Sequence, residues 1–358
     1  MDCIDGATTV RRGEELDTAR IEEFIKDSVP GLNGSLIINQ FPKGHSNLTY
    51  LLSIGEKEFV LRRPPFGRKA KSAHDMSREY RILKALRPVY SYCPEPFIYS
   101  EDETIMGCPF YIMQRIRGII LRRDFPQGMT ITPSETKELY QKVLKVQYEL
   151  HTIDYRKIGL ENIGKPNGYV KRQVTGWCER YKAALTADAP DAVKVMDWLT
   201  EHMPPDSINT GLVHNDFKLD NIVLDESDPI NIVGVLDWEM ATIGDPLMDL
   251  GSSLAYWIQN DDHPDMQAIR MMPTNAEGAP TREELIGLYS ELSGRKIDNF
   301  DFYYCFGLFR LAAIAQQIYY RYYHGQTKDE RFKTMIIGVH VLENAARRIV
   351  DKYGSQID

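Results

Sequence analysis

Apolar and polar residues alternate over much of the first third of the chain, and this period of two is typical of half-buried β-strands. A helix is predicted before the strands at 16–28 and another among them at 71–86. The alternation predicts five strands, in the segments SLIINQF, NLTYLLSI, EFVLRR, PEPFIYSEDE and PFYIMQRI. Short turns, KGH and GEK, separate the first three, which indicates a meander of antiparallel strands.

Beyond Gly118 the apolar residues recur at the helical spacing of about 3.6. Helices are predicted at 133–151, 169–185, 192–202, 282–292, 302–323 and 329–353, and a further helix is predicted to start in GDPLMDLG. A β-rich stretch interrupts them, in GLVHNDFKLDNIVLD and INIVGVLDWEMATIGDPLMDLG. The chain is therefore predicted to be α+β and bilobal, with a small β-sheet lobe at 1–116 and a large helical lobe at 117–358.

Net charge, apolar runs and cysteine spacing together disfavour several classes of protein. The 358 residues carry a formal net charge of −8, which disfavours nucleic acid and anionic membranes as partners. No run approaches the roughly 20 apolar residues of a membrane helix, and the first residues lack the apolar core of a signal peptide. The five cysteines are scattered, so reduced thiols are expected. We expect a soluble, cytoplasmic protein.

Two polar motifs in the β-rich stretch, HNDFKLDN and DWE, indicate phosphoryl transfer. That reaction needs a carboxylate to orient or deprotonate the acceptor hydroxyl, oxygen ligands for Mg²⁺, and a cation at the transferring phosphate. The motifs contain residues of these types: Asp216, Lys218, Asn221 and Asp237. The first motif matches the kinase catalytic loop H-x-D-x-x-x-x-N. Any one of these residues alone could be a turn cap, but their joint occurrence favours a site.

The chain resembles the aminoglycoside phosphotransferase and choline kinase-like family over nearly its whole length. Within that family it is most similar to the phosphotransferase domain fused to some acyl-CoA dehydrogenases. The resemblance rests on FPKGHSNLTYLL, FVLRRPP, SREYRILKAL, PFYIMQRIRG, GYVKRQVTGWCERY, VHNDFKLDNIVLD, VLDWEMATIGDPLMDLG and FRLAAIAQQIYYR. It implies a protein-kinase-like fold.

The resemblance also implies roles for the motif residues. Asp216 is expected to be the catalytic carboxylate, with Asn221 and Asp237 as Mg²⁺ ligands. His214 and Asp249 are expected to hold the catalytic loop. Lys218 would neutralise charge on the phosphoryl group, and a solvated surface lysine is the alternative. Whether Glu239 touches a second metal ion is left open.

ATP is the expected phosphoryl donor, with GTP as an alternative. Val60 and Arg62 lie on one face of a predicted strand, the face that in a kinase looks onto the nucleotide. Arg62 replaces the usual strand lysine and would pair the phosphates with support from Glu79; a surface Arg–Glu pair is the alternative. The other nucleotide-binding candidates, in the first loop and at the hinge, are Ser46, Asn47, Met113, Gln114 and Ile116.

The acceptor is expected to be a small molecule with a hydroxyl group. Aromatic and basic residues of the helical lobe are candidates to line its pocket: Arg172, Trp177, Trp238, Tyr256 and Arg310. An acidic chain suits a cationic acceptor such as an aminoglycoside or choline. Arg172 and Arg310 would suit a carboxylate or CoA thioester, and the family resemblance favours a hydroxylated acyl compound.

The predicted function is thus an ATP- and Mg²⁺-dependent small-molecule kinase. A catalytically silent nucleotide-binding module is one alternative, and the complete set of Asp216, Asn221 and Asp237 argues against it. A protein kinase is another. It is disfavoured because the chain lacks an A-P-E segment and because the interval after Asp237 is short for an activation loop.

Overall fold

The computed structural model describes residues 6–42, 47–65, 75–205 and 209–354. The chain forms two compact units. The first contains the chain up to Ile120 together with 156–160 and 221–240, and the second contains 121–155, 161–220 and 241–358. The predicted lobe boundary at 116/117 stays a prediction. The HNDFKLDN motif is divided, because Asp220 belongs to the second unit and Asn221 to the first.

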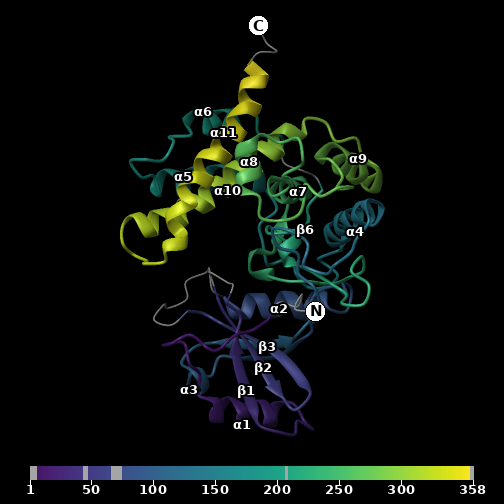
Figure 1. Cartoon of the computed structure of the whole chain (residues 1–358), viewed down its shortest axis with the longest axis vertical. Helices are drawn as coiled ribbons and strands as arrows, with labels where there is room; N and C mark the ends of the chain where they lie inside the picture. The colour runs from purple at the N-terminus through teal and green to yellow at the C-terminus, as the bar shows by residue number, and fades with distance from the viewer. Residues whose placement is uncertain (1–5, 43–46, 66–74, 206–208, 355–358) are drawn as a thin grey trace. The chain divides into compact units, whose positions relative to one another are not determined.

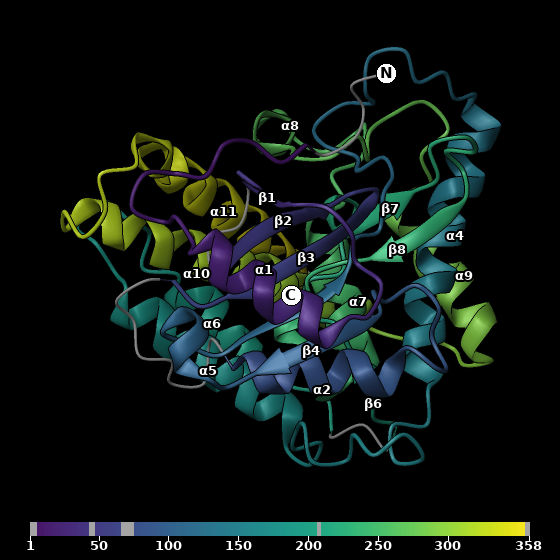
Figure 2. The same ribbon diagram turned by 90° about the horizontal axis from the view of Figure 1, so that it is seen from below.

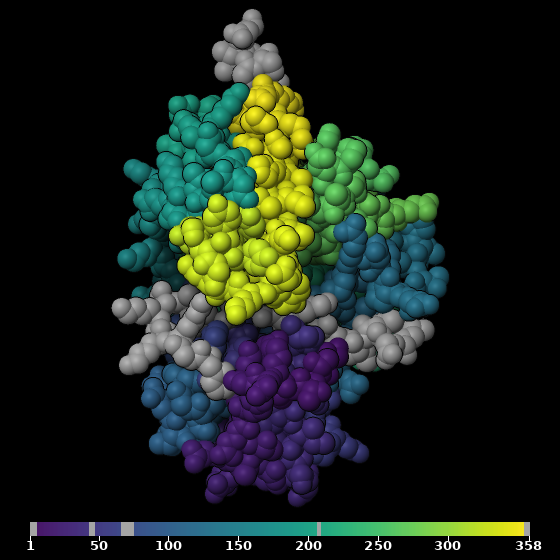
Figure 3. Space-filling view, turned by 60° about the vertical axis from the view of Figure 1, so that its left-hand side comes forward, coloured from purple at the N-terminus to yellow at the C-terminus, as the bar shows by residue number. Residues whose placement is uncertain are grey.

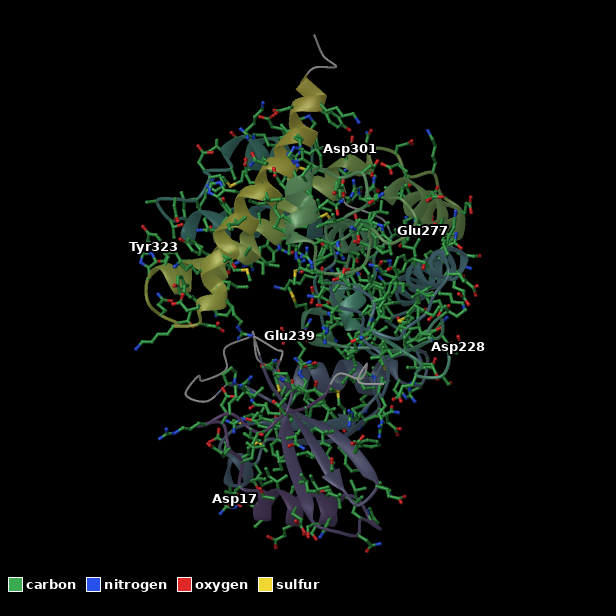
Figure 4. The ribbon with its side chains drawn as sticks, viewed as in Figure 1. Asp17, Asp228, Glu239, Glu277, Asp301 and Tyr323 are labelled. Atoms are coloured by element: carbon green, nitrogen blue, oxygen red, sulfur yellow. The ribbon has the colours of Figure 1, made fainter. Side chains whose placement is uncertain are left out.

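The first unit is built on an antiparallel five-stranded sheet with the order β1-β2-β3-β5-β4. Its strands are β1 (Leu36–Gln40), β2 (Leu48–Ile54), β3 (Lys57–Arg63), β4 (Pro96–Ser100) and β5 (Phe110–Gln114). Helix α1 (Thr18–Ser28) buries Ile21 and Ile25 against the sheet, and α2 (Met76–Leu86) lies beside β4 and β5 (Figures 1 and 2). Asp17, labelled in Figure 4, caps α1. The five predicted strands are confirmed.

One predicted strand is too long. The segment PEPFIYSEDE is extended only as far as Ser100, because the Asp102 side chain accepts a hydrogen bond from the Thr104 N–H and starts the short helix α3 (Glu103–Met106). Capping by aspartate at this position satisfies an N–H that the helix leaves without a partner.

A two-stranded ladder completes the first unit. Strands β7 (Ile222–Leu224) and β8 (Ile232–Val235) run side by side and antiparallel (Figure 2). The ladder joins Ile119 through an isolated bridge to Leu224. Gly118 makes this approach possible, because a Cβ there would lie 2.2 Å from the Leu224 oxygen. Leu236 donates its N–H to the Asn221 carbonyl at 2.8 Å, so the ladder brings Asn221 beside the start of the DWE motif.

The second unit is helical. The predicted long helices are confirmed to within two residues at each end, except that the last begins as a 3₁₀ turn, η3 (Glu330–Thr334). Helix α7, which Asp245 caps, matches the helix predicted to start in GDPLMDLG, and α8 adds to the predicted set. The helices are α4 (Pro133–Thr152), α5 (Tyr169–Ala183), α6 (Val193–Glu201), α7 (Pro246–Ala255), α8 (Pro264–Ile269), α9 (Arg282–Ser293), α10 (Phe300–Tyr323) and α11 (Met335–Gly354). Strands β6 (Gly211–Val213) and β9 (Thr242–Gly244) pair beside them. In Figure 3 α11 forms a yellow band on the surface next to α6.

Helices α7 and α10 cross with their backbones in contact. A Cβ on Gly251 would lie 2.3 Å from the Tyr303 carbonyl oxygen, and one on Gly307 would lie 2.2 Å from the Gly251 oxygen. Glycine at both positions therefore sets the distance between the two helices. Among the described residues, no helix is long and apolar enough to cross a bilayer.

Candidate active site

Arg62 is the centre of a buried charge cluster in the first unit. Strand β3 directs its guanidinium toward Glu79 of α2, whose Oε1 lies 2.7 Å from Arg62 Nη1. The two side chains are 8% and 3% exposed, so this is no surface pair. Arg62 Nη2 also lies 3.2 Å from Asp237 Oδ1 and 3.1 Å from Glu239 Oε2. Arg62 therefore contacts three carboxylates.

Burial and charge act on this cluster in opposite directions. Burial raises the pKa of Glu79, and Arg62 lowers it only in part. Burial disfavours the charged guanidinium, but Glu79 and the neighbouring acids hold the Arg62 pKa well above its ordinary value. Arg62 therefore stays charged, because the neighbouring carboxylates stabilise its positive charge.

The DWE motif follows β8 and supplies two of these carboxylates. Asp237 has φ +68°, a left-handed conformation that aspartate tolerates better than most residues. Glu239, labelled in Figure 4, lies beside α2 and accepts a hydrogen bond from Asn47 Nδ2 at 2.8 Å. Asn47 is therefore held by an acid of the motif, while Ser46 lies outside the described residues.

Trp238 does not fit the predicted role in acceptor binding. Its side chain is 1% exposed, its indole N–H donates to the Val235 carbonyl at 2.8 Å, and its ring packs edge-on against Tyr90. A side chain enclosed in this way belongs to the core of the first unit. Trp238 fixes the backbone between Asp237 and Glu239.

The oxygen donors of the first unit suit Mg²⁺. Asn221 is buried and adjoins the DWE motif through the ladder, and the Asp237 side chain is 37% exposed. Mg²⁺ in kinases is held by one or two such groups together with phosphate oxygens and water. No cage of three or more His, Cys, Asp or Glu side chains occurs in the part of the chain that the structure describes.

The remaining nucleotide-binding candidates lie on β3, on β5 and, for Ile116, just after β5. Val60 faces Met113 in the strand register, and both side chains are buried. Gln114 exchanges hydrogen bonds with Glu95, through its N–H and its Oε1. Ile116 packs over Gly234 of β8, where a larger residue would collide with it.

In the second unit, both oxygens of Asp216 have partners. Lys218 Nζ lies 3.0 Å from Asp216 Oδ2, and the Tyr256 hydroxyl donates to Oδ1 at 3.3 Å. Lys218 Nζ also lies 3.7 Å from Asp220 Oδ1 and 4.9 Å from the centre of the Tyr256 ring. The Lys218 side chain is only 17% exposed, unlike a solvated surface lysine. Burial opposes its charge, but Tyr256 and the two acids hold its pKa well above the ordinary value.

Burial raises the pKa of Tyr256 to about 12, so its hydroxyl is protonated at neutral pH and donates to Asp216. The carboxylate is thus oriented from two directions by a charged and a neutral donor. Tyr256 was predicted to line the acceptor pocket, and the structure gives it this contact with Asp216.

Asp249 of α7 anchors the loop before Asp216. Its carboxylate accepts the N–H groups of His214 at 3.1 Å and Asn215 at 2.6 Å. It also lies 2.9 Å from His151 Nε2 and accepts from Gln147 at 3.2 Å. His214 in turn accepts the Asp216 N–H at 3.3 Å. Asp249 and His214 therefore have the contacts expected of residues that hold the loop.

Protonation of Asp249 in acid should lower the free energy of unfolding of the second unit. Burial alone would raise the pKa of Asp249, but the hydrogen bond and charge of His151 and the contacts of His214 lower it from 3.8 to about 2. Because the folded pKa is depressed, the stabilisation of about 2 kcal/mol is complete above about pH 4 and is lost as the pH falls toward 2.

Urea unfolding of the wild type and Asp249→Asn, measured from pH 7 down to pH 2, tests this. The variant should be less stable at neutral pH and should lose less stability in acid. Glu149→Gln, an exposed carboxylate of α4, serves as the control and should follow the wild type. An Asp249→Asn profile as steep as that of the wild type would contradict the assignment.

Two arginines predicted to bind the acceptor have other partners. Arg172 is exposed and donates to the backbone carbonyls of Lys165 and Asn167, in the loop before its own helix. Arg310 is 3% exposed and donates to the Asn215 carbonyl at 2.6 Å, with its guanidinium 5.2 Å from the centre of the Trp177 ring. Neither arrangement supports an acceptor contact.

Three residues around Asp249 were not predicted from the sequence. Gln147 and His151 bind Asp249 from α4, and the Tyr289 hydroxyl lies 2.7 Å from His151 Nδ1. A usable signal was present, because Gln147 and His151 are polar residues four positions apart on the buried face of an amphipathic helix. Tyr289 carries no such signal.

A cavity of about 30 Å³ borders Phe217 and Lys218 and is lined mainly by apolar side chains of α4 and α7. It could hold only one or two water molecules. It is therefore too small to be the acceptor site.

Comparison with known proteins identifies the relatives of the chain. A model described as the phosphotransferase enzyme family matches residues 37–282. Acyl-CoA dehydrogenase family member 11 of Gallus gallus is 33% identical over 334 residues, which cover 91% of this chain and 42% of that protein. Family member 10 of Mus musculus is 35% identical over 323 residues, covering 89% and 30%. The chain spans less than half the length of these relatives.

Solved structures agree. A candidate aminoglycoside phosphotransferase of Ralstonia eutropha is 31% identical and covers 94% of this chain and 99% of its own, with a TM-score of 0.79. A choline kinase of Cryptosporidium parvum, at 14% identity, covers 96% and 97% with a TM-score of 0.64. An aminoglycoside phosphotransferase bound to GDP and kanamycin, at 15% identity, covers 90% and 96% with a TM-score of 0.62. The predicted resemblance and the bilobal, kinase-like fold class are confirmed.

Proposed function

Because this chain belongs to the phosphotransferase enzyme family, we propose that it transfers the γ-phosphoryl group of ATP to a hydroxyl of a small molecule, with Mg²⁺ as cofactor. The observation that carries the proposal is the buried guanidinium of Arg62 beside Asp237 and Glu239. A guanidinium binds phosphate oxygens in the same bidentate way as carboxylates. The carboxylates of Asp237 and Glu239 beside it are oxygen ligands of the kind that a divalent cation binds.

Each group has a step to perform. Arg62 binds phosphate oxygens and is held by Glu79, while Asn221 and Asp237 would hold Mg²⁺. When bound, Mg²⁺ neutralises charge on the phosphates. Asp216 accepts a hydrogen bond from the acceptor hydroxyl and takes its proton as the oxygen–phosphorus bond forms and the bond to ADP breaks. Lys218, beside Asp216, stabilises the charge of the phosphoryl group in transfer.

For the acceptor we propose a hydroxylated acyl compound. The support is the similarity to acyl-CoA dehydrogenase family members 10 and 11. Arg172 and Arg310 add no support, because both side chains bind backbone carbonyls instead. A cationic acceptor is the second candidate. It is favoured by the net charge of −8 and by the 31% identity to the Ralstonia eutropha structure.

Calorimetric titration with ATP, in Mg²⁺ and in EDTA, tests the nucleotide and metal roles. Mg²⁺ should strengthen binding to the wild type by about tenfold or more, and Asp237→Ala should abolish that gain because it removes a charged ligand. Asp228→Asn, an exposed acid between β7 and β8, is the matched control and should keep it. Binding that is independent of Mg²⁺ in the wild type would overturn the metal assignment.

The acceptor class is tested by ADP release with hydroxy acids, hydroxyacyl thioesters, choline and aminoglycosides. Turnover of the acyl compounds would support the first candidate. Turnover confined to the cationic compounds would replace it and leave the kinase proposal standing.

A further inference from the structure

The residue that precedes Asp216 has an unusual backbone. Asn215 has φ +64°, in the left-handed region that residues with a side chain seldom adopt. Asparagine tolerates this region better than most, but other conformations of the loop would compete unless contacts fix this one. The conformation of Asn215 affects the direction of the Asp216 side chain, because one peptide plane joins the two residues.

Three polar groups of Asn215 are held, each from a different helix. Its N–H donates to Asp249 Oδ1 of α7 at 2.6 Å. Its carbonyl accepts from Arg310 Nη2 of α10 at 2.6 Å, and its side-chain Oδ1 accepts from the Tyr169 hydroxyl of α5 at 3.1 Å. Contacts from three helices therefore define the orientation of this one residue.

The two side-chain donors are themselves confined. Arg310 is 3% exposed and stacks over Trp177, so its guanidinium is aimed by packing. Tyr169 is 4% exposed, and burial raises its pKa well above the ordinary value. The hydroxyl of Tyr169 is therefore protonated at any working pH and donates to Asn215.

We infer that Tyr169 and Arg310 are positioning residues that act on Asp216 through Asn215. This inference rests on the proposed function, in which Asp216 orients the acceptor hydroxyl. A displacement of about 1 Å at a reacting group can cost about 100-fold in rate, so fixing Asn215 contributes to the chemical step without contact with substrate. Arg310 was predicted to bind the acceptor. In this inference it instead holds the loop that carries Asp216.

Tyr169→Phe tests the inference, because it removes one hydroxyl and keeps the ring. With water as acceptor, ADP release from Mg·ATP should fall about three- to tenfold in kcat, the worth of one hydrogen bond, while KM for Mg·ATP stays unchanged. Tyr140→Phe is the matched control, since Tyr140 is also buried and its hydroxyl donates to the Pro273 carbonyl. It should lose comparable thermal stability and keep kcat.

A second readout does not depend on activity. Hydrogen exchange of the peptide 213–219 should be faster in Tyr169→Phe and Arg310→Met than in the wild type, and unchanged in Tyr140→Phe. Arg310→Lys should restore part of the protection, because lysine can still donate to the Asn215 carbonyl.

The two readouts separate the inference from the proposed function. If the wild type neither binds nor hydrolyses ATP, the kinase proposal fails, while the exchange data still decide whether Tyr169 and Arg310 order the loop. Equal exchange in Tyr169→Phe and Tyr140→Phe overturns the inference. A change in KM for Mg·ATP with kcat unaltered also overturns it.

Discussion

Replacing Asp216 by Asn should lower kcat by about 10²–10⁴-fold while the affinity for Mg·ATP stays within a few-fold. The amide keeps the size of the carboxylate but cannot take the acceptor proton, and it loses the ion pair with Lys218 at 3.0 Å. The comparison variant is Asp220→Asn, because Asp220 is also close to Lys218, at 3.7 Å. The assays are steady-state turnover on the acceptor found by the panel and calorimetry with ATP.

If the unpairing of Lys218 caused the loss, Asp220→Asn would share it. We expect Asp220→Asn to retain most of the activity. Near-normal turnover by Asp216→Asn on that acceptor would remove Asp216 from the chemical step.

Replacing Arg62 by Met should destabilise the first unit by about 3–5 kcal/mol, because it leaves the buried Glu79 carboxylate without its cation. Urea unfolding measures this loss. ATP affinity should fall as well, since methionine cannot bind phosphate.

Loss of folding alone would also abolish ATP binding, so a second variant separates the two effects. Arg62→Met combined with Glu79→Leu replaces the pair by apolar side chains and should regain much of the stability. It should still fail to bind ATP in calorimetry. Wild-type affinity in this stable double variant would show that Arg62 has a structural role only.

The fold was predictable because each unit follows one strong periodicity. Alternation gave the strands of the sheet, and the helical spacing located the long helices of the second unit. The short elements escaped because they depend on capping. Helix α3 exists because Asp102 caps it, and α8 begins at a His263 cap followed by proline. Over four to six residues such local signals outweigh periodicity.

The site was predictable where its residues are ordered by one strand or one motif. Alternation along β3 placed Val60 and Arg62 on one face, and the resemblance to kinases implied the pairing of Arg62 with Glu79 that the structure contains. Arg310 was misjudged for the opposite reason. Its partner, the Asn215 carbonyl, is 95 residues away in the sequence. Every residue has a backbone carbonyl, so no residue type marks this partner.

The glycine crossing of α7 and α10 has a mechanical consequence. Asp249 lies two residues before Gly251, and Arg310 lies three residues after Gly307, so two of the three residues that hold Asn215 lie within one turn of the crossing. No side chain lies between the two backbones there to rotate and absorb a relative shift. Because the contact there is backbone to backbone, a motion that keeps α7 and α10 packed moves Asp249 and Arg310 together.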